Sequence, residues 1–299
     1  MPSVPWWIER VDRLLAPTDL GGLGAGALWH LSERLQFIHE NVEPALLEQD
    51  FESLPDCRTT WSTFLRRESD VLVALREVVG RIAASLRRGE LDADAFRSIW
   101  QRLGFLVNAE GGGTPADDYL DAVSQVPRIT LGEARPPSGM LNMASRAERI
   151  ADFIEVTRPG IDDSIVDIGS GNGKFALTVA ASTSSRVRGI EYGGTYVAAA
   201  RASAAFLGTS KLDFIHADVR DVDLSMGNIF YLYHPFQGEV ALSVARALGR
   251  LGRERAITVY LLGPTSGFGE HFLHEVEDGA LSLSERRGEF SQVLVLRSP

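Results

Sequence analysis

Cysteine is nearly absent from this sequence, which has one such residue, Cys57, in 299. A disulfide framework and a cysteine-rich zinc site each need several thiols, so the composition excludes both. A chain that forms no internal disulfide suits a reducing compartment, and we therefore expect a cytoplasmic protein. We also expect no bound metal.

Basic blocks and long apolar runs are missing as well. Asp and Glu outnumber Lys and Arg by 40 to 30, which gives a formal net charge of −10, and the basic residues are scattered or paired. An acidic field repels phosphate backbones, so we expect no nucleic-acid partner. No stretch approaches the roughly 20 apolar residues that span a bilayer, and the N-terminus lacks a basic start followed by an apolar run. We therefore expect a soluble protein with no membrane partner.

Helical periodicity dominates the first part of the chain. The composition is globular, with 44% hydrophobic residues, and apolar side chains recur at three- and four-residue intervals, which predicts four or five amphipathic helices. Glycine and proline then accumulate between Asn108 and Ser138, which indicates a linker. We predict a helical domain over 1–110, a linker over 111–138 with one short helix at 116–122, and a second domain over 139–299.

The second domain alternates short apolar runs with helical stretches. The predicted strands are 164–168, 186–191, 211–217, 228–233, 256–262, 281–286 and 292–296. The stretches between them with helical periodicity are 173–181, 196–207, 238–251 and 268–276. This alternation predicts an α/β fold with a doubly wound parallel sheet, and the short turn between the last two strands predicts an antiparallel hairpin at its edge.

The strongest local signal is the segment IVDIGSGNGK, in which a strand ends in an acid and opens through three glycines into a helix. Glycine is needed where the backbone turns with positive φ or approaches a ligand closely. A dinucleotide-binding loop requires Gly or Ala where Lys174 stands, so the spacing disfavours NAD and FAD. The order Asp167, Gly169, Gly171, Gly173 instead resembles motif I of the class I S-adenosylmethionine (SAM)-dependent methyltransferases.

Acids at the next two predicted strand ends extend this resemblance. Glu191 ends the second strand, where a carboxylate can accept hydrogen bonds from both hydroxyls of a ribose. The third strand is followed by Asp218 and Val219. In the family, the matching acid accepts from the adenine amino group and the next backbone N–H meets a ring nitrogen. The resemblance therefore implies SAM as the cofactor and a seven-stranded, Rossmann-like methyltransferase sheet.

The resemblance also implies how the methionine part of SAM is held. Asp167 and the backbone of Gly169 hold its amino group. In the segment ahead of the motif, either Ser145 or Asn142 reaches its carboxylate.

The end of the fourth strand should lie beside the sulfonium, because ligands in such sheets bind outside the strand ends. N-methylating members of the family often carry Asn or Asp followed by Pro-Pro and an aromatic residue here. This chain departs from that pattern with His234-Pro235-Phe236. His234 is a candidate general base, with satisfaction of backbone groups as the alternative. Tyr233 and Tyr192 are candidates for the sulfonium environment through cation–π contacts.

The segments VDIGSGNGKFALTVA and IFYLYHPF most resemble the branch of the family that contains the non-SET histone-lysine methyltransferases. The resemblance covers about 138–299 and leaves the first 110 residues without a counterpart. Three functions stay open. The first is a methyltransferase for a small molecule, with the helical domain as a cap. The second is a SAM-consuming cyclase that releases methylthioadenosine and a cyclic amino acid such as azetidine-2-carboxylate. The third is a non-catalytic SAM-binding protein. Neither the acceptor nor the oligomeric state follows from the sequence.

One histidine pair has spacing that could serve a metal. His271 and His274 lie three residues apart on a predicted helix and share a face. A plain surface helix and a substrate-contacting helix are the alternatives, and the surface helix is our expectation.

Overall fold

The computed structural model describes residues 20, 27, 28, 30–32, 34–36, 38, 39, 55–105, 114–126, 144–287 and 292–298. Beyond helical residues between 27 and 39, the described helices are α3 (Pro55–Arg87), α4 (Ala93–Leu103), α5 (Pro115–Ser124), α6 (Ala147–Thr157), α7 (Lys174–Ser182), α8 (Gly194–Leu207), α9 (Gly238–Glu254) and α10 (Glu270–Glu277). The described strands are β1 (Ser164–Ile168), β2 (Arg186–Glu191), β3 (Leu212–His216), β4 (Ile229–Tyr233), β5 (Thr258–Gly263), β6 (Ser282–Arg287) and β7 (Gln292–Arg297). Short turns add η3 (Val219–Asp221), η4 (Leu224–Met226) and η5 (Thr265–Gly269).

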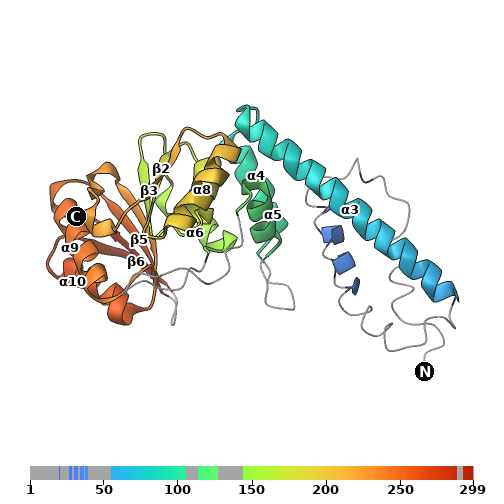
Figure 1. Ribbon diagram of the computed structural model, residues 1–299. Coiled ribbons are helices and arrows are strands. Elements are labelled where there is room, and N and C mark those ends of the chain that lie inside the picture. Colours follow the sequence, from blue (N-terminus) through green and yellow to red (C-terminus); the bar gives the residue numbers. More distant parts are fainter. Residues whose placement is uncertain are drawn as a thin grey trace, which may run out of the picture.

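The described strands form one sheet, which lies at the far end of the molecule from α3 (Figure 1). The seven strands follow the order β3-β2-β1-β4-β5-β7-β6. Strands β1 to β5 pair in parallel, and β7 runs antiparallel between β5 and β6. This confirms the predicted doubly wound, Rossmann-like sheet with a terminal hairpin, and every strand lies within two residues of its predicted bounds. The strand order reverses between β1 and β4, so a ligand is expected at their carboxyl ends.

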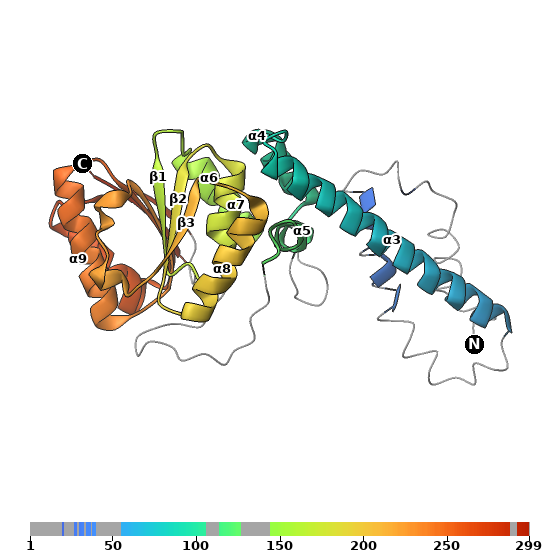
Figure 2. The same ribbon diagram turned by 45° about the horizontal axis from the view of Figure 1, so that its top comes forward.

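Helices cover both faces of the sheet, with α6, α7 and α8 on one side and α9 on the other (Figure 2). Side chains along β4 alternate between the two faces of the sheet, so this strand contributes to the apolar cores on both faces. Tyr231 and Tyr233 pack into the apolar cluster formed with α6 and α7. Phe230 and Leu232 belong to a separate cluster that includes side chains of α9 and α10.

Helices α4 and α5 form a further layer outside α7. Phe96 and Trp100 of α4 and Tyr119 of α5 are fully buried in the same cluster as the side chains of α6 and α7. The indole Nε1 of Trp100 donates to Ser182 Oγ at 3.1 Å. The short helix predicted at 116–122 is confirmed as α5, and it packs into the core of the sheet domain. The predicted domain boundaries fall outside the described residues and stay a prediction.

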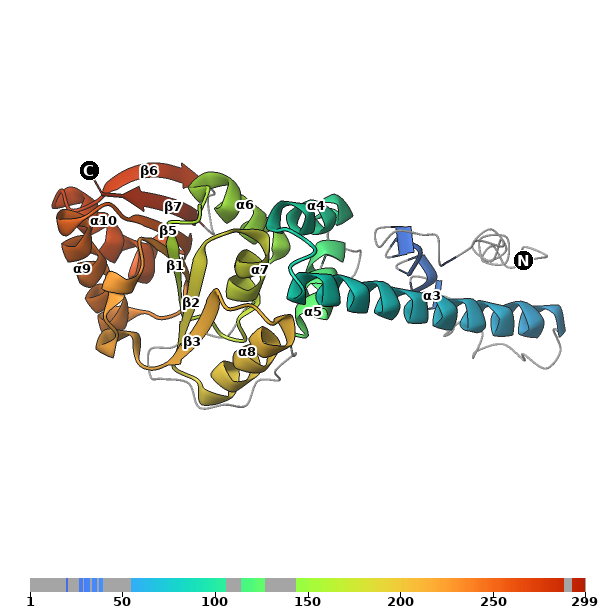
Figure 3. The ribbon, with the colours of Figure 1, turned by 90° about the horizontal axis from the view of Figure 1, so that it is seen from above.

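Helix α3 extends away from the rest of the molecule (Figure 3). Its C-terminal residue contacts the end of α8, where Arg87 Nη1 donates to the Phe206 carbonyl at 3.0 Å and the guanidinium lies 4.8 Å from the Phe206 ring centroid. This end of α8 leads into the start of β3, so the contact is at the sheet edge opposite the strand carboxyl ends. The cap expected over those ends stays a prediction. None of the described helices is long and apolar enough to cross a membrane.

Candidate functional site

The glycine loop after β1 has the conformation that its sequence predicts. Gly169, Gly171 and Gly173 have φ values of 79°, 53° and 83°, which residues with a Cβ rarely adopt. A Cβ on Gly169 would lie 2.2 Å from the Pro235 Cβ, and one on Gly173 would lie 2.7 Å from the Phe214 ring. Glycine is therefore required at both positions by backbone conformation and by close packing.

Backbone hydrogen bonds fix this loop to β2. The amides of Gly169 and Ser170 both donate to the Ile190 carbonyl, at 2.9 and 3.0 Å. These bonds hold the loop at the carboxyl edge of β1, which is where the βα turns of nucleotide-binding sheets lie.

Asp167 is a buried acid with unused bonding capacity. Its side chain is 3% exposed, and Oδ2 has no hydrogen-bond partner within the described part of the chain. Burial raises the pKa of Asp167 well above its usual value, and the charge of Glu191 raises it further, partly opposed by a backbone hydrogen bond from Ala176. A buried acceptor without a partner costs stability, so Asp167 calls for a donor or a cation supplied by a ligand.

Glu191 is held in place by two backbone amides. Its Oε2 accepts from the Gly171 N–H at 2.9 Å, and its Oε1 accepts from the Gly193 N–H at 2.7 Å. An ionised carboxylate offers about four acceptor positions, two on each oxygen. Each oxygen therefore keeps one position free, enough for two hydroxyl groups.

Asp218 is oriented by Arg220 at the end of β3. Oδ1 accepts from the Arg220 backbone N–H and Nε at 2.9 and 3.0 Å, and Oδ2 accepts from Nη2 at 2.6 Å. The side-chain hydrogen bonds from Arg220 lower the pKa of Asp218. Three of its four acceptor positions are used, which leaves one on Oδ2. Val219, the next residue, is buried.

His234 follows β4 in an unusual backbone conformation, with φ at 39°. Such values are rare for residues other than glycine and concentrate at functional sites. Its ring packs 5.2 Å from Phe268, between centroids, and its Nε2 is buried without a partner within the described residues. Burial lowers the pKa of His234, so the neutral imidazole is the form present near neutral pH.

The two tyrosines proposed for the sulfonium environment differ in exposure. Tyr233 is half-buried at the end of β4, whereas Tyr192 is 48% exposed. The backbone carbonyl of Tyr192 accepts a hydrogen bond from His216 Nε2 at 3.0 Å. Tyr192 therefore lies at the surface, next to the end of β3.

Ser145 lies ahead of α6 and is buried, with its hydroxyl 2.8 Å from the hydroxyl of Tyr231. Tyr231 in turn stacks on Phe175 with ring centroids 3.6 Å apart, and it is the register partner of Asp167 on the adjacent parallel strand β1. Ser145 therefore lies near β1 and β4, the two strands between which the strand order reverses. Asn142, the other candidate, lies outside the described residues.

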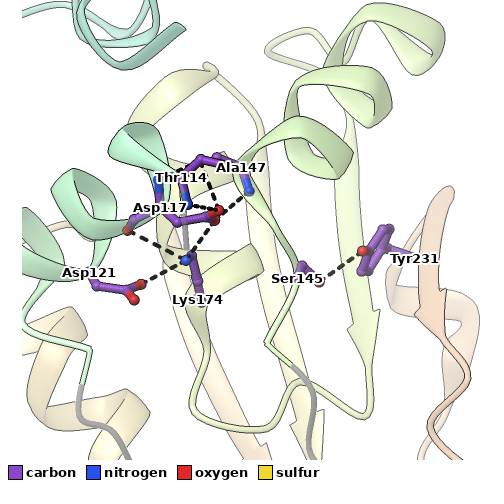
Figure 4. A network of polar contacts seen from close by, with 7 residues as sticks. All are labelled: Thr114, Asp117, Asp121, Ser145, Ala147, Lys174 and Tyr231. Carbon is purple, nitrogen blue, oxygen red and sulfur yellow. Dashed lines mark hydrogen bonds and ion pairs between the residues drawn. The ribbon is translucent and has the colours of Figure 1, made fainter. Parts of the chain in front are cut away.

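A buried ion cluster beside the glycine loop is a feature that sequence reasoning did not identify (Figure 4). Lys174 Nζ lies 2.9 Å from Asp117 Oδ1 and 2.9 Å from Asp121 Oδ1. The signal available was Lys174 itself, a cation immediately after the glycine motif. Its partners belong to a segment predicted as linker, and neither periodicity nor spacing connects them to the motif.

The histidine pair on α10 does not form a metal site in the described structure. His274 is exposed and its Nδ1 lies 3.1 Å from Glu277 Oε2. Across the described residues there is no group of three or more His, Cys, Asp or Glu side chains placed to hold a metal ion.

Comparisons with known proteins give structural similarity only. The sequence matches no protein-family model and no curated protein. An RNA methyltransferase from Salinibacter ruber, solved with S-adenosyl-L-homocysteine, is 19% identical, and the match covers 52% of this chain and 94% of that one with a TM-score of 0.41. A precorrin-6y C5,15-methyltransferase from Geobacter metallireducens is 14% identical over 54% of this chain and 93% of that one, with a TM-score of 0.44.

A third similar structure is geranyl diphosphate C-methyltransferase from Streptomyces coelicolor, which contains Mg²⁺, geranyl diphosphate and S-adenosyl-L-homocysteine. It is 13% identical over 50% of this chain and 78% of that one, with a TM-score of 0.41. At these identities and TM-scores, ligand and reaction have to be assigned from the site residues themselves.

Proposed function

We propose that this protein binds SAM at the carboxyl ends of β1, β2 and β3 and transfers its methyl group to a small molecule. The observation that carries the proposal is a series of three carboxylates on successive strand ends, each with acceptor capacity to spare. Asp167 Oδ2 has no partner within the described residues, Glu191 keeps two acceptor positions, and Asp218 keeps one. SAM carries matching donors in an ammonium group, two ribose hydroxyls and an adenine amino group.

The residue roles follow from this match. Asp167 and the backbone of Gly169 would hold the ammonium group, Glu191 the ribose, and Asp218 the adenine amino group beside the N–H of Val219. The glycine at 171, like its neighbours, lets the backbone approach the cofactor without a Cβ. Ser145, whose hydroxyl contacts that of Tyr231 on the strand next to Asp167, is proposed to reach the methionine carboxylate.

SAM supplies a methyl group already activated on a sulfonium, so the protein has to position the acceptor, exclude water and take up any proton released. His234 is proposed as the general base, and its lowered pKa favours this role because only the neutral imidazole accepts a proton. Tyr233 is proposed to line the sulfonium site and Tyr192 its rim.

The net charge of −10 favours a small acceptor over a nucleic acid. The resemblance to the non-SET histone-lysine branch is proposed as ancestry, and it does not set the acceptor.

A second candidate function follows from the same histidine. In place of the Asn or Asp of amine-methylating relatives, this chain offers a neutral imidazole at the β4 end. A base of this kind suits a cyclase, in which the methionine amine of SAM attacks its own γ-carbon. The C–S bond breaks, methylthioadenosine leaves, the four-membered azetidine-2-carboxylate ring forms, and the amine proton passes to the base.

Calorimetry with S-adenosylhomocysteine tests the cofactor assignment. We expect wild-type protein to bind it, and Glu191→Ala to weaken binding by about 1.5–3 kcal/mol, the range for a hydrogen-bonding partner with charge. The matched control is Glu254→Ala, an exposed acid at the end of α9, which should bind as wild type. Equal affinities for the Glu191 variant and the control would remove Glu191 from the site.

Mass spectrometry of protein with SAM and no acceptor separates the three functions. A methyltransferase should give only traces of S-adenosylhomocysteine, because water is a poor nucleophile in a closed site. A cyclase should convert SAM steadily to methylthioadenosine, because its nucleophile is already part of the bound molecule. Binding without any turnover, including with panels of small amines, thiols and phenols, would support the non-catalytic reading.

A further inference from the structure

Lys174 occupies a position that is electrostatically unfavourable for a lysine. It is the first residue of α7, directly after Gly173, and its side chain is 5% exposed. A cation at a helix N-terminus faces the positive end of the helix dipole, and burial adds a desolvation cost. A lysine in this place needs strong compensation, which the carboxylates of Asp117 and Asp121 on α5 provide.

Asp117 connects three helix N-termini (Figure 4). Within α5 it forms a capping box, since its Oδ2 accepts from the Thr114 backbone N–H at 3.1 Å and from the Thr114 hydroxyl at 2.9 Å. Its Oδ1 accepts from the Ala147 N–H, at the start of α6, at 2.7 Å. The same Oδ1 receives Lys174 Nζ of α7. One carboxylate thus sets the relative position of α5, α6 and the start of α7.

Two of the helices joined in this way, α6 and α7, begin next to candidate cofactor residues. The start of α7 is the end of the glycine loop, whose other described anchors are backbone bonds to β2 and to Glu191. Two residues ahead of Ala147 is Ser145, which reaches Tyr231 beside Asp167. The ammonium group of Lys174 is paired with the carboxylates of α5. This lysine therefore supports the glycine loop and does not bind a ligand itself.

We infer that Lys174 and Asp117 are positioning residues that hold the glycine loop in its binding conformation by fastening it to α5. The inference rests on the proposed function, since it gives the cluster a role at the same SAM site. Without the ion pair, the loop would keep its glycines and its bonds to β2, but the first turn of α7 would lose its lateral anchor. The glycine loop would then be less ordered before binding.

The test compares Lys174→Met with the double variant Lys174→Met/Asp121→Asn. The single variant leaves the buried carboxylate of Asp117 and the partly exposed carboxylate of Asp121 without their shared cation. The double variant also removes the charge of Asp121 and leaves Asp117 satisfied by Thr114 and Ala147. Arg88→Met, which removes an exposed ion pair with Glu90, is the control. Three quantities are measured on each: S-adenosylhomocysteine affinity, melting temperature, and hydrogen exchange of the amides of 169–174 in the ligand-free protein.

For a positioning role we expect the double variant to recover the melting temperature but not the affinity, which should stay about tenfold below wild type. Loop amides should exchange faster in both Lys174 variants and remain unchanged in the control. Recovery of affinity together with melting temperature would overturn the inference and leave a purely structural ion pair. If wild-type protein does not bind S-adenosylhomocysteine, the proposed function fails. In that case, loop exchange equal to wild type in the double variant would also overturn the positioning role, and faster exchange would retain it.

Discussion

Asp167 is buried, its Oδ2 has no hydrogen-bond partner among the residues that the structure describes, and Glu191 is a neighbouring charge. These features favour ligand binding at the expense of stability. Its pKa in the folded, ligand-free protein is raised above the value of about 3.9 for an unfolded chain. Between the two values the folded state binds more protons than the unfolded state, so stability falls as pH rises through that window. The contribution of Asp167 to stability is therefore lower at neutral pH than in acid.

Replacing this acid should expose that cost. We expect Asp167→Asn to raise the free energy of unfolding of the ligand-free protein at neutral pH by about 1–3 kcal/mol, the scale of an unsatisfied buried group. We expect the same variant to lose the thermal stabilisation that S-adenosylhomocysteine gives the wild type. Denaturant unfolding at several pH values measures the first effect, and the gain should shrink toward acid, where the wild-type carboxyl is protonated. A variant less stable than wild type at neutral pH would contradict this assignment.

At the scale of elements, the turn between β1 and α7 shows two separate reasons for glycine. Gly169 has positive φ and also lies against Pro235, so both conformation and space exclude a side chain. Gly89, after α3, has a φ of 67° but meets nothing within 4 Å of a built Cβ. The pair therefore separates the cost of conformation from the cost of packing.

Alanine at these two positions should have unequal effects. We expect Gly89→Ala to cost about 1 kcal/mol of stability, the cost of a left-handed conformation. Gly169→Ala should cost about 1–3 kcal/mol more, the range for overpacking a filled site. Only Gly169→Ala should weaken S-adenosylhomocysteine binding, since Pro235 and the loop must move apart. Equal losses of stability would mean that the β1 turn can relax around a methyl group.

At the scale of the whole molecule, helices α3, α4 and α5 differ in the surfaces against which their side chains are buried. Side chains of α4 and α5 are buried in the core of the sheet domain. Most of helix α3 belongs to a separate apolar cluster, formed with Leu28, Leu35 and Ile38. Its last turns, which include the fully buried Ala83, pack into the core of the sheet domain. Deletions that end on either side of α4 should therefore behave differently.

We expect removal of 1–88 to leave a folded protein that binds S-adenosylhomocysteine within about threefold of the full chain, because the cut falls before α4 and well away from the site. Removal of 1–105 should destabilise the protein strongly, since it takes away Phe96 and Trp100, and losing one such aromatic side chain costs about 3–5 kcal/mol. Melting temperature and calorimetry on both truncations check this. Turnover by the shorter chain at the full-length rate would exclude a cap role for 1–88.

The sequence by itself determined the sheet and most of the candidate cofactor residues. Strand periodicity and turn chemistry act over a few residues, so β1 to β7 and the glycine loop could be located from local pattern alone. The acids Asp167, Glu191 and Asp218 were predicted from the resemblance to the methyltransferase pattern, which places acids at the ends of successive strands, where parallel strands meet at one edge.

Only the tertiary structure decided which distant side chains meet. The pairing of Lys174 with Asp117 and Asp121 joins residues 57 and 53 positions apart across a loop, and such contacts depend on packing rather than on local pattern. The backbone conformation of His234 and the contact of Pro235 with Gly169 likewise arise where β1, β4 and β5 converge. The burial of Trp100 also depends on the tertiary structure. An amphipathic pattern in the sequence predicts an apolar helix face but does not indicate which surface will cover that face.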